Sequence, residues 1–372
     1  MISVDVYESI EEIDQEIIMQ WGELEKRALT SNAYLSPSFI IPAIKYLTPD
    51  SSIVIIIIND VTESGTVILG VGVFEKIKPT LRYPFTYLRT YRSEHSFIGG
   101  MLLDDRKYRE ALHYLLTYLK SENKYSAIQF SDVSLFTELS DSNHELEKNC
   151  IHWFNFENID RLILIPKNSG IEYLKNTMSK RSYKNIKRKK RKLNELGDVE
   201  WSLTSKDKIT SKIPETFLEL ECSGWKGDVG STLSRSSETE KFFNEMVSNF
   251  KKYNDIFFTE IKLNGKSIAS TCNLISGNVG FAFKLAWDVG YSKYSIGVLN
   301  EIDLVSHAPE LLGNLDYIDG GTNKGSFLEK LWIDKHTLHS GMYSLNKFSY
   351  YCLWFIFRVK DIKKMLISKF NF

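Results

Sequence analysis

The sequence has few cysteines and no excess of either charge. Its cysteines lie far apart and form no Cys-x-x-Cys pair, which argues against a zinc site or a disulfide framework and fits a reducing compartment; they are Cys150, Cys222, Cys272 and Cys352. The 47 Lys and Arg residues balance 47 Asp and Glu residues, so no overall field recruits nucleic acid. We expect neither a metal cofactor nor a DNA partner.

Long apolar runs are also missing. The apolar run at 53–58 is far shorter than a membrane span, and the N-terminus lacks the basic and apolar regions of a signal peptide. Residues 348–357 are strongly apolar, but charged residues follow from Arg358 onward. We expect this segment to pack internally or to form a subunit contact, as in a homodimer, with peripheral membrane contact as the alternative. The expected location is the cytoplasm.

The composition is that of an ordinary globular protein, with 43% hydrophobic and 25% charged residues in a chain of 372. This length favours two domains. Pattern and turn signals predict the first half as helices at 8–29 and 37–47, strands at 52–59, 66–76, 85–92 and 96–103, a helix capped by Asp104 or Asp105, a strand at 126–130, a helix ending near 148, and strands at 151–156 and 161–165.

The second half repeats this order after a joint at 166–170. We expect helices from Ser179 to Gly197, from Pro214 and from a capping box at 237–240, then strands at 256–263, 267–275 and 281–287, a helix at 296–308, a strand at 315–319, a helix through Phe327 and a strand at 338–345. The expected fold class is α/β (α+β), with two similar domains at 1–165 and 166–372. Each would be a mixed, mostly antiparallel sheet flanked by helices.

One stretch, residues 281–299, joins a strand, a turn and a helix start. Asp288 and Gly290 indicate a turn, and apolar residues with helical spacing follow from around Gly297. The first turn of a helix carries free backbone N–H groups at the positive end of the helix dipole. This junction is therefore suited to bind an anion, most often a phosphate.

Several short motifs follow one another in a fixed order along the second half. They are the basic segment 180–192, Trp225 after the next helix, Asn264-Gly-Lys-Ser-Ile-Ala269, Asp288 followed by Tyr294-Ser-Ile-Gly297 and Leu299, Asp319, and Lys330-Leu-Trp332. This ordered set resembles the GNAT acyltransferase superfamily, in particular its double-domain branch related to cellulose-biosynthesis-type acetyltransferases and Fem-type aminoacyl transferases. In the first half, Tyr34-Leu-Ser-Pro-Ser-Phe39 and Phe97-Ile-Gly-Gly100 are similar to that branch as well.

The resemblance implies that the second domain binds coenzyme A, as the acyl-CoA donor, at the 281–299 junction. The cofactor-binding residues it implies are Lys284, Leu285, Ala286, Tyr294, Ser295, Ile296, Gly297, Val298, Leu299, Asn323 and Lys330. The first domain would be a degenerate copy, because three residues separate Gly99-Gly100 from the start of its helix.

The acceptor would attack the thioester directly, since no Gly-x-Ser-x-Gly motif or recognisable nucleophilic cysteine is present. An amine acceptor must lose a proton, and the candidate bases are Asp288, Asp319 and Glu260. Each of them is equally compatible with a cap, a turn or a surface charge. The expected acceptor-binding residues are Glu94, His95, Arg181, Lys184, Trp225 and Lys226.

The basic segment 180–192 contains nine Lys or Arg residues in thirteen. It is either a solvated surface or a site for a phosphate-bearing ligand. We expect an N-acyltransferase that moves an acetyl or short hydroxyacyl group, such as 3-hydroxybutyryl, to the amine of a dTDP- or UDP-linked amino sugar in polysaccharide biosynthesis. The alternatives are a Fem-type tRNA-dependent aminoacyl transferase, ranked lower because only Tyr183 is aromatic within the run, and a non-catalytic scaffold in polysaccharide export.

Overall fold

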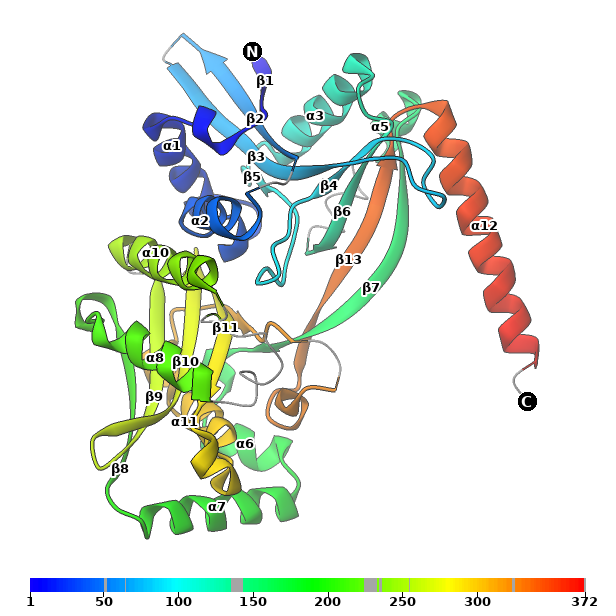
Figure 1. Cartoon of the computed structure of the whole chain (residues 1–372). Coiled ribbons are helices and arrows are strands. Elements are labelled where there is room, and N and C mark those ends of the chain that lie inside the picture. The colour runs from blue at the N-terminus through cyan, green and yellow to red at the C-terminus, as the bar shows by residue number, and fades with distance from the viewer. Residues whose placement is uncertain are drawn as a thin grey trace. The chain divides into compact units, whose positions relative to one another are not determined.

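The computed structural model describes residues 1–49, 52–63, 65–134, 143–223, 233, 236–253, 255–322 and 325–370. The chain forms two compact units (Figure 1). Unit 1 comprises Met1–Thr30, Asp50–Ile159 and Thr337–Phe372, and unit 2 comprises Ser31–Pro49 and Asp160–His336. No helix in the described part of the chain has the length and apolar character to cross a membrane.

Unit 1 is a sheet with helices on both faces. Its strands are β1 (Ile2–Tyr7), β2 (Ile53–Thr62), β3 (Gly65–Ile77), β4 (Tyr87–Thr90), β5 (Leu102–Leu103) and β6 (Ala127–Val133), together with parts of β7 (His152–Leu164) and β13 (Asp334–Ser344). Its helices are α1 (Gln15–Lys26), α3 (Tyr108–Glu122), α5 (Asn143–Lys148) and α12 (Lys347–Phe370). The predicted hairpin is confirmed by the antiparallel pairing of β2 and β3.

Alternating side chains along β6 and β13 separate the two apolar layers of unit 1. On one face, Ile128 and Tyr343 pack with the predicted apolar stripe of α3. On the other face, Ala127 and Met342 pack with Leu353 of α12. One side of the aromatic C-terminal segment therefore packs on the sheet. On its other side, four aromatic side chains are exposed: Phe348, Tyr351, Trp354 and Phe355.

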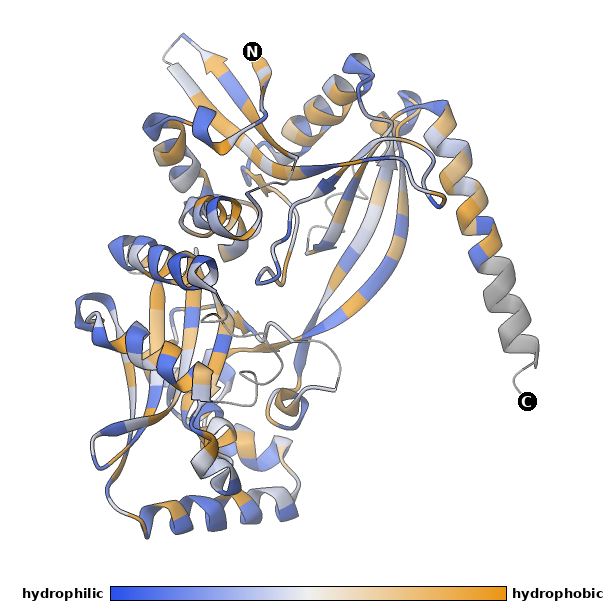
Figure 2. Cartoon of the chain, viewed as in Figure 1, coloured by the Kyte–Doolittle hydropathy of each residue, from blue (hydrophilic) through white to orange (hydrophobic). Residues whose placement is uncertain are grey.

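Unit 2 is a second mixed sheet flanked by helices. Its strands are β8 (Val199–Ser205), β9 (Ile256–Leu263), β10 (Lys266–Ser276), β11 (Val279–Trp287), β12 (Tyr317–Asp319) and the end of β7. Its helices are α2 (Pro37–Leu47), α6 (Ile171–Thr177), α7 (Lys180–Asn194), α8 (Lys212–Ser223), α10 (Ser237–Tyr253) and α11 (Ile296–Leu311). Figure 2 shows α7 as predominantly hydrophilic, with a few apolar positions.

The two units repeat one topology, as the element order predicted. In unit 1, antiparallel strands β2, β3 and β4 lead through α3 to β6, which pairs parallel to β4. In unit 2, antiparallel strands β9, β10 and β11 lead through α11 to β12, which pairs parallel to β11. The mixed α/β fold expected from the sequence is therefore present.

Each half of the chain contributes one strand to the unit formed mainly by the other half. The end of β7, from the first half, pairs with β12 of unit 2. The end of β13, from the second half, pairs with β6 of unit 1. This exchange explains why the units are discontinuous in sequence, and no local pattern signals it.

Several predicted details are wrong. Residues 96–103 form a strand only at β5, and Lys107 rather than Asp104 or Asp105 is the N-cap of α3, because the Asp104 carboxylate binds Arg27 (2.7 Å). The capping box of α10 begins one residue earlier than predicted, at Ser236. The backbone N–H of Ser236 donates to the Thr239 hydroxyl, and the backbone N–H of Thr239 donates to the Ser236 hydroxyl. The helix expected through Phe327 is a single 3-10 turn, η6 (Phe327–Lys330).

Candidate functional site

The predicted strand–turn–helix junction is present at the end of β11. The turn is the 3-10 helix η5 (Val289–Tyr294), and Ser295 then adopts a left-handed conformation with φ +56° before α11 begins. Leu299 donates its N–H to the carbonyl of Ser295 (3.0 Å), the first bond of the helix. The N–H groups of Ile296, Gly297 and Val298 precede that bond, so the helix itself gives them no acceptor. This end of α11 is suited to an anion.

A lysine side chain adds a full positive charge beside this helix end. Lys189 of α7 donates to the Ser295 hydroxyl, with 2.5 Å between Nζ and Oγ. The next residue, Lys190, pairs with the carboxylate of Asp303 on α11 at 2.6 Å and holds the two helices together. Leu193 of α7 is buried in an apolar cluster with Ile296 and Leu299 of α11, and this packing fixes the orientation of α7. The basic segment therefore does more than form a solvated surface.

Gly297 allows the first turn of α11 to lie directly on the end of β11. A Cβ atom at this position would lie 3.2 Å from Cδ2 of Leu285 and 3.5 Å from Cε3 of Trp287. Any larger side chain would push against β11. The glycine thus keeps the candidate anion site next to the strand that precedes it.

Strand pairing on the other side of β11 stops partway along the strand. The parallel register with β12 covers residues 279–281 and ends at the pair Phe281 and Asp319. In the described part of the chain, no strand pairs with the remaining residues of β11 on this side. A bulge at Phe283 shifts the register with β10 at the same level. The two strands therefore separate at Asp319, beside Lys284, Leu285 and Ala286.

The face of the sheet against α8 carries buried charges. Glu221 of α8 is completely buried and lies 3.6 Å from Nζ of Lys284. Burial, with a smaller contribution from the Glu221 charge, raises the pKa of the neighbouring Cys272 thiol well above its usual value. Glu260 is also buried on β9, where Ser267 donates to it and Lys262 lies 3.5 Å away. Cys272 is therefore a poor nucleophile.

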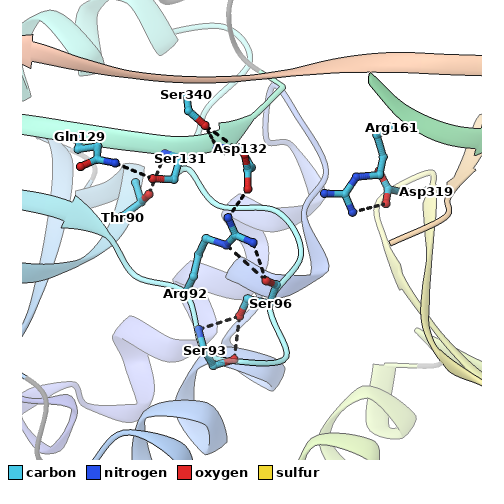
Figure 3. A network of polar contacts seen from close by, with 10 residues as sticks. All are labelled: Thr90, Arg92, Ser93, Ser96, Gln129, Ser131, Asp132, Arg161, Asp319 and Ser340. Carbon is cyan, nitrogen blue, oxygen red and sulfur yellow. Dashed lines mark hydrogen bonds and ion pairs between the residues drawn. The ribbon is translucent and has the colours of Figure 1, made fainter. Parts of the chain in front are cut away.

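Asp319 occupies the point of strand separation and is fully buried. Gly321 donates its N–H to Oδ1 at 2.7 Å. Figure 3 shows the contact of Arg161, whose Nη1 lies 3.8 Å from the same oxygen. The other oxygen, Oδ2, lies 2.7 Å from Nε2 of His336. The sequence signalled Asp319 but missed Arg161, Glu221 and His336. Arg161 and Glu221 each interrupt an apolar pattern with a charge, and this signal could have identified both residues from the sequence.

The equivalent position in unit 1 is closed by polar contacts. Arg92 forms an ion pair with Asp132 and donates to the carbonyl of Ser96 (3.2 Å) (Figure 3). The N–H of Gly99 bonds to the carbonyl of Asp132 at 3.2 Å, so the loop after β4 lies against the end of β6. In unit 1, therefore, polar contacts tie the loop after β4 to the end of β6.

The remaining predicted residues are spread over both units. Asp288 closes its turn by accepting the N–H of Gly290 at 2.9 Å. Arg181 and Lys184 line a surface groove of about 780 Å³ along α7. Glu94 and His95 lie in the unit 1 loop that follows β4, and Lys330 ends the turn η6 of unit 2. Three predicted residues, Trp225, Lys226 and Asn323, lie outside the described residues. Among described side chains, no group of His, Cys, Asp and Glu is arranged to hold a metal ion.

Comparison with known proteins supports an acyltransferase domain in the second half. Residues 180–326 match the family model of the acetyltransferase (GNAT) domain. This match covers α7 and the whole β9–β12 region, including the candidate anion site and the point of strand separation. No curated protein matches the chain.

Solved structures share the fold over almost the whole chain. FemX is 12% identical, with 87% of this chain and 95% of that chain covered and a TM-score of 0.55. A conserved protein of unknown function from Bacteroides thetaiotaomicron is 11% identical, with 92% and 100% covered and a TM-score of 0.54. L-PGS from Bacillus licheniformis is 10% identical, with 93% and 96% covered and a TM-score of 0.51. At these identities the likeness concerns the fold alone.

Proposed function

We propose that the protein is an acyl-CoA-dependent N-acyltransferase that uses unit 2 to transfer an acyl group to an amine. The observation that carries the proposal is the separation of β11 from β12 at Asp319, with the cationic end of α11 packed on the far end of the same strand. This arrangement suits an extended thioester ligand, with its phosphates at residues 295–298 and its acyl end beside β11.

The residues present fit coenzyme A. The Ile296, Gly297 and Val298 N–H groups and the Lys189 side chain would hold the pyrophosphate. The backbone of residues 284–286 would border the acyl group, where a donor N–H stabilises an oxyanion. Bound acyl-coenzyme A would supply an activated acyl group and a thiolate leaving group.

The reaction needs no covalent enzyme intermediate. The acceptor nitrogen, once deprotonated, attacks the carbonyl carbon of the thioester, a C–N bond forms and the C–S bond breaks. The chain must accept a proton from the ammonium form of the acceptor, and buried carboxylates or a histidine linked to one are suited to that task. Asp319 and Glu260 remain candidates, whereas Asp288 has its carboxylate in a turn hydrogen bond.

The acceptor we propose is an amino sugar carried on a nucleoside diphosphate. Support comes from the outward side of α7, where five cationic residues line the groove: Arg181, Lys184, Lys187, Arg188 and Arg191. Guanidinium groups bind phosphates in a bidentate manner, so such a groove suits a diphosphate. The same cationic groove also suits one other candidate function, that of a Fem-type transferase that takes its acyl group from a charged tRNA.

The test is acyl transfer by the purified full-length chain. Acetyl-CoA or 3-hydroxybutyryl-CoA is supplied with dTDP- and UDP-amino sugars, free amino sugars and simple amines, and released thiol is measured. Amine-dependent thiol release supports the proposal. Absence of release over the whole panel would contradict it, and activity only with charged tRNA would favour the Fem-type alternative. Tight coenzyme A binding without turnover would indicate a scaffold.

A further inference from the structure

His336 and Asp319 form a histidine–carboxylate pair in unit 2. Nε2 of His336 lies 2.7 Å from Oδ2 of Asp319, and the histidine side chain is 18% exposed whereas Asp319 is completely buried. Among the described residues, the second ring nitrogen, Nδ1, has no hydrogen-bond partner. An ionised carboxylate only accepts hydrogen bonds, so the network assigns the proton to Nε2 and leaves Nδ1 as the acceptor.

The surroundings hold the carboxylate rigid. The Gly321 N–H and the Arg161 guanidinium, at 2.7 and 3.8 Å, engage its other oxygen, Oδ1. Both groups are hydrogen-bond donors, so they fix Oδ1 as an acceptor on one side of the carboxylate. Oδ2 is therefore directed at His336, as in histidines that a buried carboxylate orients for proton transfer.

Among the described residues, Tyr317 is a second titratable group that packs against His336. Its ring lies 5.4 Å from the imidazole ring. Burial, with added repulsion from Asp319 and Asp316, raises the pKa of Tyr317 to about 12, so the phenol stays neutral. Among the described residues, the charged group at ion-pair distance from His336 is Asp319 of β12.

The pair lies at the position where β11 and β12 part. Asp319 and Phe281 form the last register pair, and in parallel strands such neighbours project their side chains to the same face. Phe281 packs edge-on against Tyr34. Its neighbour Ala282 packs in the apolar cluster that contains Leu304 and Val305 of α11, so Phe281 lies on the opposite face. An acceptor approaching the acyl end of a thioester from that face would meet His336 first, because Asp319 lies behind it.

We infer that His336 is the general base of the proposed acyl transfer and that Asp319 is its positioning residue. The inference rests on the proposed function. The acceptor ammonium gives one proton to Nδ1 of His336, which passes it to solvent. The neutral nitrogen attacks the thioester carbon, a C–N bond forms, and the electron pair of the broken C–S bond leaves on sulfur. The sulfur takes the second nitrogen proton, so amide and free coenzyme A result.

Kinetics test the role of His336 directly. We expect His336→Gln to lower kcat by about 10²- to 10⁴-fold, the usual contribution of a general base, with the KM for acyl-CoA unchanged. Asp319→Asn should lower kcat by at least about tenfold, since the ring loses its fixed orientation. His339→Gln is the matched control, because this histidine lies on the same strand with its ring bonded to Asn158.

Two further measurements separate catalysis from folding. Imidazole in the buffer should restore part of the activity of His336→Ala, which a merely structural defect would not allow. Diethyl pyrocarbonate, followed by peptide mass spectrometry, should modify His336 in the free full-length protein, and acetyl-CoA should protect it. Coenzyme A affinity, measured by calorimetry, should be the same in His336→Gln and the unaltered protein.

The outcomes distinguish a failure of the proposed function from a failure of the role assigned to His336. If the unaltered protein transfers no acyl group to any acceptor, the proposed function fails and the role of His336 fails with it. If the unaltered protein is active and His336→Gln keeps its kcat within about threefold, only the inference is overturned. Unrescued His336→Ala, or a His336 that acetyl-CoA does not protect, would also overturn it.

Discussion

The ammonium group of Lys189 lies 2.5 Å from the hydroxyl of Ser295, the residue at which α11 begins. One lysine of a strongly basic helix is thereby directed at the helix end that the backbone already makes positive. The arrangement gives α7 two distinct sides. Lys189 and Lys190 face α11, whereas Arg181, Lys184 and Arg188 line the outer groove.

Removal of the Lys189 charge should weaken coenzyme A binding. A charge-assisted bond to a phosphate contributes about 1.5–3 kcal/mol, so Lys189→Ala should raise Kd by about 10- to 100-fold in calorimetry. Lys192→Ala, an exposed lysine on the same helix, should leave Kd unchanged. If both substitutions raise Kd equally, Lys189 acts only through its positive charge and makes no specific contact with the phosphate.

Asn300 should be a major stabilising residue of unit 2. It is fully buried on α11, donates to the hydroxyls of Thr259 (2.9 Å) and Thr271 (2.7 Å), and accepts the indole N–H of Trp201 (3.0 Å). Asn300→Leu removes these three bonds and leaves the threonine hydroxyls only their bond to each other (2.7 Å), so it should lower the free energy of unfolding by about 2–4 kcal/mol.

Denaturant titration measures this loss. Ser306→Ala provides the control on the same helix, because it removes only a half-buried bond to the carbonyl of Ile302. A change in the Asn300→Leu variant no larger than that of Ser306→Ala would contradict the structural role of the network.

Glu301 should make stability depend on pH. Burial raises its pKa from 4.5 to about 7. Between these values the folded state binds a proton that the unfolded state has lost, so the free energy of unfolding falls as pH rises from 4.5 to 7 and then levels off. The full loss is roughly 3 kcal/mol, since one pKa unit corresponds to about 1.4 kcal/mol.

The variant Glu301→Gln isolates this effect. It should be more stable than the unaltered chain at pH 8 and gain no such advantage at pH 4.5, as measured by denaturant titration at both values. The same difference in stability at both pH values would rule out Glu301 as the source.

The outer groove of α7 should discriminate between acceptors. Replacement of Lys184 and Arg188 by glutamate reverses the charge that would bind a diphosphate, so KM for a nucleotide-linked amino sugar should rise more than about tenfold. The KM for the corresponding free amino sugar serves as the internal control and should not change. If both KM values rise equally, or neither rises, the nucleotide-linked acceptor loses its support.

The sequence predicted β9, β10, β11 and the start of α11 well because their signals are local. Asn264 and Gly265 adopt the positive φ values, 50° and 78°, that a two-residue hairpin turn requires, and the strands on both sides fall where the pattern put them. The helix start near Ile296 was predicted for the same reason. Short elements with weak periodicity, such as β8 and α6, were missed, as was β1.

Long-range arrangements could not be predicted from one sequence. The pairing of β7 with β12 and of β13 with β6 depends on contacts between residues more than 100 positions apart. His336 illustrates the consequence, because its partner Asp319 was noted while the strand that carries the histidine was expected to start only at 338. The roles of the other site residues, including Lys284 and Glu260, stay predictions until a ligand is located.

A crystal structure of the protein with acetyl-CoA tests the central claim most directly. We predict that the pyrophosphate lies within hydrogen-bond distance of the Gly297 and Val298 N–H groups and of Lys189. The thioester should lie beside residues 284–286, where β11 has parted from β12. Coenzyme A bound in unit 1 or along the outer groove of α7, with the α11 helix start free of phosphate, would contradict the account.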